Sequence, residues 1–215
     1  MLSTEIRTLL WGVLAIGITL ATAKVTNDRA EDKNSYIWGK ETAVFLLVCF
    51  AVSLFTGYTA VEKSTSVHVW VVLMMSYITV LGAAVIDYKL HVIPNVFPVF
   101  LMAGKALVIL YELCCTGNVK WDVISSLTGF GACLAVLIIA GTFTRGGIGK
   151  GDVKLLASIG FACGVYPVFV TLTIALLYCA VVSVLLIIIK KISLKDSLPF
   201  GPFIFLGYLS MIYYI

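Results

Sequence analysis

Charged residues are scarce in this chain. Only 12% of its 215 residues are charged, whereas 61% are hydrophobic, and the mean hydropathy is +1.08. A soluble domain of this length does not need so much apolar surface, but a bilayer-spanning helix requires a run of about 20 apolar residues. The runs do not alternate apolar and polar residues, which argues against a transmembrane β-barrel. The composition therefore predicts an all-α, polytopic integral membrane protein.

Cysteine pairs and histidine clusters are also missing. None of the six cysteines forms a C-x-x-C pair, and most lie inside apolar runs, where cysteine behaves as a small hydrophobic residue. The two histidines, His68 and His91, have no cluster of partner ligands. We therefore expect no zinc site, no disulfide framework and no cofactor. The first apolar run is not followed by a cleavage site that precedes a soluble domain, so this run is expected to be a retained span and not a removed signal peptide.

Eight apolar stretches are expected to form transmembrane helices. The first five cover about residues 6–23, 42–60, 67–86, 96–113 and 122–143. A longer apolar stretch, 155–189, is interrupted at 164–167 by Gly-Val-Tyr-Pro, which predicts a short, partial sixth span and a full seventh. The eighth covers 200–215. Loops are expected at 24–41, 61–66, 88–95, 114–121, 144–155 and 190–199. We divide the chain into a two-helix segment with a short polar cytoplasmic loop (1–66) and a six-helix core (67–215).

The distribution of lysine and arginine predicts the orientation. The connections after spans 1, 3, 5 and 7 carry most of the 15 basic residues, whereas the opposite side carries only Arg7, Lys63 and Lys120. Because basic loops stay in the cytoplasm, these connections are expected to be cytoplasmic. This asymmetry accounts for the net charge of +4, so the partner is expected to be a lipid bilayer and not nucleic acid.

The stretch 144–155 reads Thr-Arg-Gly-Gly-Ile-Gly-Lys-Gly-Asp-Val-Lys-Leu and lies between two apolar runs. Its four glycines allow backbone conformations with positive φ and close approach of another chain. The loop places Asp152 at the start of the next apolar run, where a helix N-terminus stabilises a carboxylate. An acid at a membrane edge is a functional-site hypothesis.

A second acid, Asp87, closes the third span on the same predicted side and at a similar depth. Two adjacent carboxylates cannot easily both be ionised, so they share a proton. The charged one can activate a water and the protonated one can polarise a carbonyl, which is peptide hydrolysis without metal or covalent intermediate. Two other interpretations stay open: helix caps or ion pairs with Lys89, Lys150 or Lys154, and a proton- or cation-coupled transporter site.

Three motifs extend this pattern. Asp87 is followed by Ile93-Pro94-Asn95, Gly149-Lys150-Gly151-Asp152 continues to Lys154 and Leu155, and 199–202 reads Pro-Phe-Gly-Pro. In this order they resemble the type IV prepilin peptidases, a G-x-G-D family of membrane aspartic proteases. Presenilin-like proteases share the G-x-G-D motif, but they resemble one another in a Y-D motif before it and a P-A-L motif after it. Neither of these motifs is present in this chain.

The resemblance implies that Asp87 and Asp152 are catalytic and that pilin-like precursors are cleaved at the cytoplasmic face of a prokaryotic inner membrane. Gly149 and Gly151 would let the loop move and admit substrate. Pro94 and Asn95 would shape the turn that holds Asp87, and Lys154 would tune the pair or contact substrate. The larger family members carry two C-x-x-C pairs after span 1 and also N-methylate the product. The segment 24–41 has no cysteine, so we expect no methyl transfer. The alternative is a presenilin-like protease of broader specificity.

Overall fold

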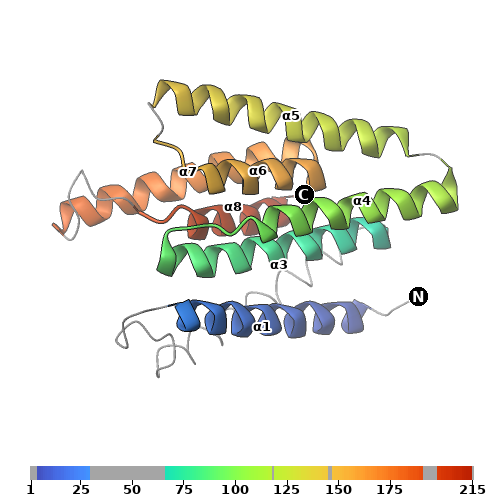
Figure 1. Ribbon diagram of the computed structural model, residues 1–215, viewed down its shortest axis with the longest axis horizontal. Helices are drawn as coiled ribbons and strands as arrows, with labels where there is room; N and C mark the ends of the chain where they lie inside the picture. Colours follow the sequence, from blue (N-terminus) through green and yellow to red (C-terminus); the bar gives the residue numbers. More distant parts are fainter. Residues whose placement is uncertain (1–3, 30–65, 118, 145–146, 191–197, 215) are drawn as a thin grey trace.

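The computed structural model describes residues 4–29, 66–117, 119–144, 147–190 and 198–214, and within them all regular structure is helical. The predicted all-α class is confirmed to this extent. The expected second span, 42–60, lies outside the described residues. The helices, shown in Figure 1, are α1 (Thr4–Arg29), α3 (Val67–Leu90), α4 (Val96–Thr116), α5 (Lys120–Phe143), α6 (Lys150–Cys163), α7 (Val165–Ile188) and α8 (Gly201–Tyr214).

Four of these helices, α3, α4, α5 and α7, are long and apolar enough to cross a membrane. The two shorter helices α6 and α8 have 14 residues each. At about 1.5 Å per residue, each extends about 21 Å, short of the hydrocarbon thickness of about 30 Å. The expected partial sixth span is therefore a short helix, and the residues of the expected eighth span form another.

Several helices continue beyond the apolar runs that predict them. Residues 24–29 belong to α1, residues 88–90 to α3 and residues 150–154 to α6, so all three segments were wrongly expected to be loops. Hydropathy measures contact with lipid, whereas a helix ends where the backbone leaves the right-handed region. His91 at φ 52° ends α3 and Gly117 at φ 69° ends α4. Gly164 at φ 91° alone separates α6 from α7, in place of the expected break at 164–167.

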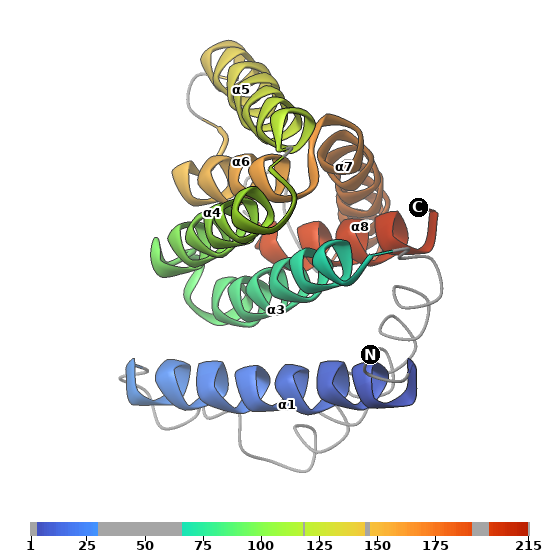
Figure 2. The same cartoon turned by 90° about the vertical axis from the view of Figure 1, so that its right-hand side faces the viewer.

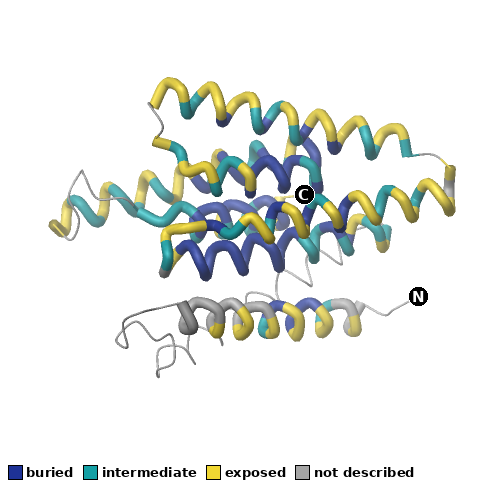
Figure 3. The backbone as a smooth tube through the Cα atoms, viewed as in Figure 1, coloured by how far each residue is buried: buried dark blue, intermediate teal, exposed yellow. Residues whose placement is uncertain are grey.

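The helix α3 lies at the centre of the bundle. It packs against α1, α4, α6 and α8, as the view in Figure 2 shows for α1, α4 and α8. In its apolar stretch 72% of the residues are buried inside the molecule, compared with 22%, 22% and 17% for α4, α5 and α7. Figure 3 shows the same contrast, with dark blue along the C-terminal half of α3 and mostly yellow on α5. The three outer helices therefore present apolar residues to the surroundings, as lipid-facing helices do.

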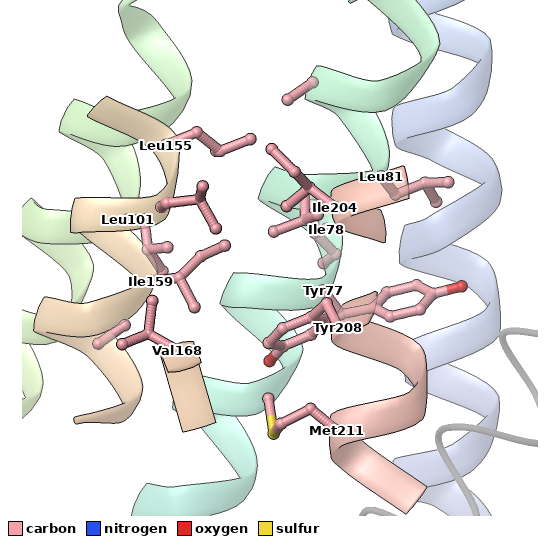
Figure 4. Close-up of a cluster of buried hydrophobic side chains, with 14 of the residues drawn as sticks. Tyr77, Ile78, Leu81, Leu101, Leu155, Ile159, Val168, Ile204, Tyr208 and Met211 are labelled. Carbon is pink, nitrogen blue, oxygen red and sulfur yellow. The ribbon is translucent and has the colours of Figure 1, made fainter. Parts of the chain in front are cut away.

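Buried side chains from all the described helices form one hydrophobic core around α3. Figure 4 shows members of this core from α3, α4, α6, α7 and α8: Tyr77, Ile78, Leu81, Leu101, Leu155, Ile159, Val168, Ile204, Tyr208 and Met211. Tyr208 donates a hydrogen bond through its hydroxyl to the carbonyl of Leu73 at 3.0 Å, which satisfies its buried polar group. This core fixes α6 and α8 against the middle of α3.

Two helix pairs approach so closely that only glycine fits between them. A Cβ atom on Gly129 of α5 would collide with the carbonyl oxygen of Gly160 on α6, and a Cβ atom on Gly160 would lie 2.5 Å from the carbonyl oxygen of Gly129. Gly207 of α8 packs in the same way against the backbone of Thr171 on α7. Small residues of this kind let helices pack tightly in membranes.

The topology brings particular helix ends to one end of the bundle. The N-terminal ends of α4, α6 and α8 and the C-terminal ends of α3 and α5 lie together at the left of Figure 1. Residues that are far apart in sequence, including those around Asp87, Asp152 and Gly201, therefore meet at this end.

Candidate active site

Asp87 lies in the last turn of α3, four residues before the cap at His91. Its side chain points into the bundle, and the residue is only 6% exposed. The Oδ2 atom accepts a hydrogen bond from the backbone N–H of Gly201 at 2.7 Å. Gly201 is the first residue of α8, where backbone N–H groups have no partner within the helix. A carboxylate is a suitable partner for such a group.

Asp152 lies in the first turn of α6 and is half-buried. This residue is outside the four helices that can cross a membrane. Burial, and to a smaller extent the negative charge of Asp87, together raise the pKa of Asp152 to about 6. The structure therefore brings together the two predicted acids, which are separated by 65 positions in the chain. One proton shared between them would leave one carboxylate and one neutral acid.

Glycines make the space that the two acids occupy. A Cβ atom on Gly149 would lie 2.5 Å from Oδ2 of Asp152, and one on Gly201 would lie 2.8 Å from Cβ of Asp87. Gly149 has φ −63° and ψ 131°, values open to any residue, so positive φ is not the reason for glycine at this position. The expectation of positive-φ conformations is thus wrong here; instead, a Cβ atom at this position would displace the Asp152 carboxyl.

Gly151 does not lie in a loop, because α6 begins at Lys150. A Cβ atom on Gly151 would lie 3.0 Å from Cβ of Ile93, the buried residue that precedes Pro94. Gly151 therefore lets the first turn of α6 rest on the turn that connects α3 with α4. This helical position contradicts the expected place of Gly151 in a flexible loop.

Lys154 and Asn95 connect the same two elements on the surface. Nζ of Lys154 donates a hydrogen bond to Oδ1 of Asn95 at 3.0 Å, and both residues are exposed. Asn95 is the N-cap of α4, and the half-buried Pro94 before it accepts a hydrogen bond from the N–H of Phe97 at 3.3 Å. Lys154 therefore connects the start of α6 to the N-terminal end of α4.

A second group of ionisable residues lies on α3, α4 and the start of α5, away from Asp87. Nζ of the buried Lys105 is 3.6 Å from Oδ1 of Asp122, and Nδ1 of His68 is 3.9 Å from Oε1 of Glu112. These ion pairs between described side chains involve neither Asp87 nor Asp152. Among the described residues, no group of three or more His, Cys, Asp or Glu side chains could hold a metal ion.

Gly201 is the site residue that the sequence-based prediction missed. It lies within the Pro-Phe-Gly-Pro stretch at 199–202, which carried the resemblance without an assigned role. Gly201 contributes through its backbone N–H, and the types of side chain in the sequence do not indicate such a contribution. Pro199 and Pro202 were the available signal, because they restrict the backbone on both sides of the Phe200 and Gly201 N–H groups.

Fold and site together define a helical membrane protein with one buried and one half-buried carboxyl group at one end of its bundle. Residues 72–184, just over half of the chain, match the type IV leader peptidase family, and both aspartates lie inside the match. The chain belongs to this family.

A curated relative adds to this result. The chain is 31% identical over 83 residues to the prepilin leader peptidase/N-methyltransferase of Bacillus subtilis (strain 168). The matched part is 39% of this chain and 34% of the relative, so the match spans about a third of the relative's length. No solved structure matches the chain.

Proposed function

We propose that this protein is a membrane aspartic endopeptidase that removes the leader peptide of type IV pilin-like precursors. The observation that carries the proposal is the pair of Asp87 and Asp152, a buried and a half-buried acid from different helices with no cation among their described partners. Burying two acids together is costly for folding, and such sites are usually functional. Membership of the leader peptidase family supports the substrate class.

The pair can hydrolyse a peptide bond in two steps. The ionised carboxyl takes a proton from water while the neutral carboxyl gives its proton to the substrate carbonyl oxygen, which yields a tetrahedral intermediate. The C–N bond then breaks, the first carboxyl gives its proton to the leaving amine, and the second recovers a proton from a hydroxyl of the intermediate. Both carboxyl groups return to their starting states.

The proposed arrangement places the chemistry at the cytoplasmic face of a prokaryotic inner membrane. The concentration of lysine and arginine on one side of the sequence supports this orientation. We further propose that residues 67–215 form the peptidase core and that residues 1–66 are an accessory membrane segment. A pilin-like precursor, with a cytoplasmic leader followed by an apolar helix, would bring its leader junction to this face.

Gly149, Gly151, Pro94, Asn95 and Lys154 are proposed to position the pair and the substrate. Gly151 and the Lys154–Asn95 hydrogen bond hold the first turn of α6 on the α3–α4 turn, and Gly149 leaves room for the Asp152 carboxyl. Substrate could then approach along the exposed backbone at 147 and 149.

The test is cleavage of a purified pilin-like precursor by wild type, Asp87→Asn and Asp152→Asn, read by the mass of the products. We expect wild type to cut at the leader junction, both folded variants to leave the precursor whole, and the product to gain no methyl group. Cleavage inside the apolar segments of unrelated substrates would favour a broad presenilin-like protease. If wild type cuts neither, the peptidase proposal is wrong and transport becomes the better interpretation.

A further inference from the structure

The two acids receive different support from the backbone. The Asp87 carboxyl accepts the 2.7 Å hydrogen bond from Gly201, which comes from the first N–H of α8. No corresponding backbone donor is found for Asp152 in the part of the chain that the structure describes. Hydrogen bonding to the charged form of a carboxyl favours that form. The structure thus contains an asymmetry that the sequence motifs alone do not reveal.

Helix dipoles act on both acids and do not reverse this difference. Asp152 lies in the first turn of α6, where the dipole favours its charge, and Asp87 lies in the last turn of α3, where the dipole opposes its charge. A direct hydrogen bond to a charged group outweighs the field of a helix end. Burial acts in the opposite direction on Asp152 and, together with the charge of Asp87, raises its pKa to about 6.

The other charged groups nearby leave the asymmetry in place. The helix α8 has no Asp, Glu, Lys, Arg or His, and α6 contributes the exposed Lys150 and Lys154, the latter bonded to Asn95 of α4. The His91 ring is 3.4 Å from the Asp87 backbone carbonyl. From α1, Lys24 is exposed.

We propose that the backbone N–H of Gly201 sets the order of protonation in the pair. It holds Asp87 as the carboxylate that acts as general base and leaves the shared proton on Asp152, which acts as general acid. Gly201 is thus a positioning residue, and its lack of a side chain is required because a Cβ atom would lie 2.9 Å from Oδ2 of Asp87. The assignment rests on the proposed function for its meaning in catalysis, but the location of the proton is measurable without it.

The first experiment locates the proton by infrared difference spectroscopy on the full chain in detergent. At about pH 5, one unit below the pKa of Asp152, we expect the band of a neutral carboxyl to disappear in Asp152→Asn and to persist in wild type. Loss of the band in Asp87→Asn but not in Asp152→Asn would overturn the assignment. This readout needs no substrate, so it stands even if the precursor-cleavage test fails.

The second experiment removes the N–H alone. Incorporation of glycolic acid at position 201 (Gly201→glycolate) replaces the N–H with an ester oxygen and adds no atom beside Asp87. We expect the neutral-carboxyl band to become sensitive to Asp87→Asn, and precursor cleavage to fall by about tenfold or more.

Gly207→glycolate is the matched control, because Gly207 is a buried glycine of the same helix that has no contact with Asp87 among those described. Its cleavage rate should stay within about threefold of wild type, since it loses one helical N–H only. Equal loss in both ester variants, or an unmoved proton in Gly201→glycolate, would mean that Gly201 has only a structural role. If the position 201 ester does not fold, the location of the proton in the Asp→Asn variants still decides the assignment.

Discussion

The bundle contains two groups of ionisable residues, and they differ in how their charges are balanced. In the group away from the candidate site, Lys105 is paired with Asp122 and His68 with Glu112, and the Asp122 side chain is 49% exposed to solvent. At the candidate site, Asp87 lies close enough to Asp152 for its charge to raise the pKa of Asp152. The backbone N–H of Gly201 is the one described hydrogen-bond donor to the two carboxyl groups. Pairs of opposite charge are ordinary in folded proteins, whereas two acids that disfavour each other's charge are a costly arrangement, which is typical of catalytic sites.

The largest difference between the groups should appear on neutralising one acid in each. Asp87→Asn and Asp152→Asn should each lower kcat/KM for precursor cleavage by about three orders of magnitude, because acid–base catalysis is lost. Asp122→Asn should change it by less than about threefold, since a half-exposed acid can lose its partner cheaply. At pH 7 Asp152→Asn should melt no lower than wild type, because it removes a buried charge. Comparable losses of kcat/KM in all three variants would show that the two groups of ionisable residues do not differ in their contribution to cleavage.

Glycine substitutions should show the same contrast at a smaller scale. Gly149→Ala and Gly201→Ala place a methyl group against the aspartates, and displacement of a reacting group by about 1 Å can cost about 10²-fold in rate. Gly131→Ala on α5 is the control, because a Cβ atom there meets nothing within 4 Å. It should keep full activity and gain about 0.5–1 kcal/mol of stability, measured by thermal unfolding. Full activity in Gly149→Ala and Gly201→Ala would show that the close packing is not needed.

The pH dependence of kcat/KM should reflect the ionisation of Asp87 and Asp152, which have no cation among their described partners. The proton on Asp152 is present below a pKa of about 6 and is lost as pH rises through that value. Catalysis needs this proton, so kcat/KM should fall by about tenfold per unit at higher pH. Asp122→Asn should show the same fall of kcat/KM at higher pH. Measuring kcat/KM from about pH 4 to 9 would check this. A profile that stays flat from pH 5 to 8 would contradict the role of Asp152 as the acid.

Sequence reasoning succeeded where a physical property repeats along the chain. Long apolar runs identify α3, α4, α5 and α7, because a bilayer requires them. It also selected Asp87 and Asp152, because acids at the ends of such runs are rare. The predicted helix ends were wrong at positions such as Leu90 and Lys150, because polar residues continue these helices beyond the apolar runs. Sequence reasoning could not find the Gly201–Asp87 bond, since a backbone donor 114 residues away has no side-chain signal.

The surface contact between α4 and α6 should have a smaller effect. Lys154→Ala and Asn95→Ala each remove the 3.0 Å hydrogen bond, which is exposed and therefore worth about 0.5–1.5 kcal/mol at most. If the bond positions the start of α6, each single variant should lose several-fold in kcat/KM and the double variant should lose no more. Additive losses in this cycle would instead indicate that Lys154 acts on substrate independently of Asn95.

The smallest effect is expected in the balanced group. Lys105→Met keeps the apolar stem of the buried side chain and removes its charge, while Asp122 can be hydrated. Stability in detergent should change by about 1 kcal/mol or less, and cleavage should stay within about twofold. A tenfold loss of cleavage in a protein that melts normally would show that this distant group takes part in catalysis.

The contact between Gly129 and Gly160 gives α6 the geometry of a lever. Backbone touches backbone there, so this point of α6 has little freedom to slide or separate from α5. Asp152 lies eight residues from Gly160, a lever arm of about 12 Å at 1.5 Å per residue. A tilt of about 5° about the contact therefore moves the carboxyl by about 1 Å, the scale on which catalytic rates change steeply. Gly129 and Gly160, which lie away from the two carboxyl groups, thus limit how far the Asp152 carboxyl can move relative to Asp87.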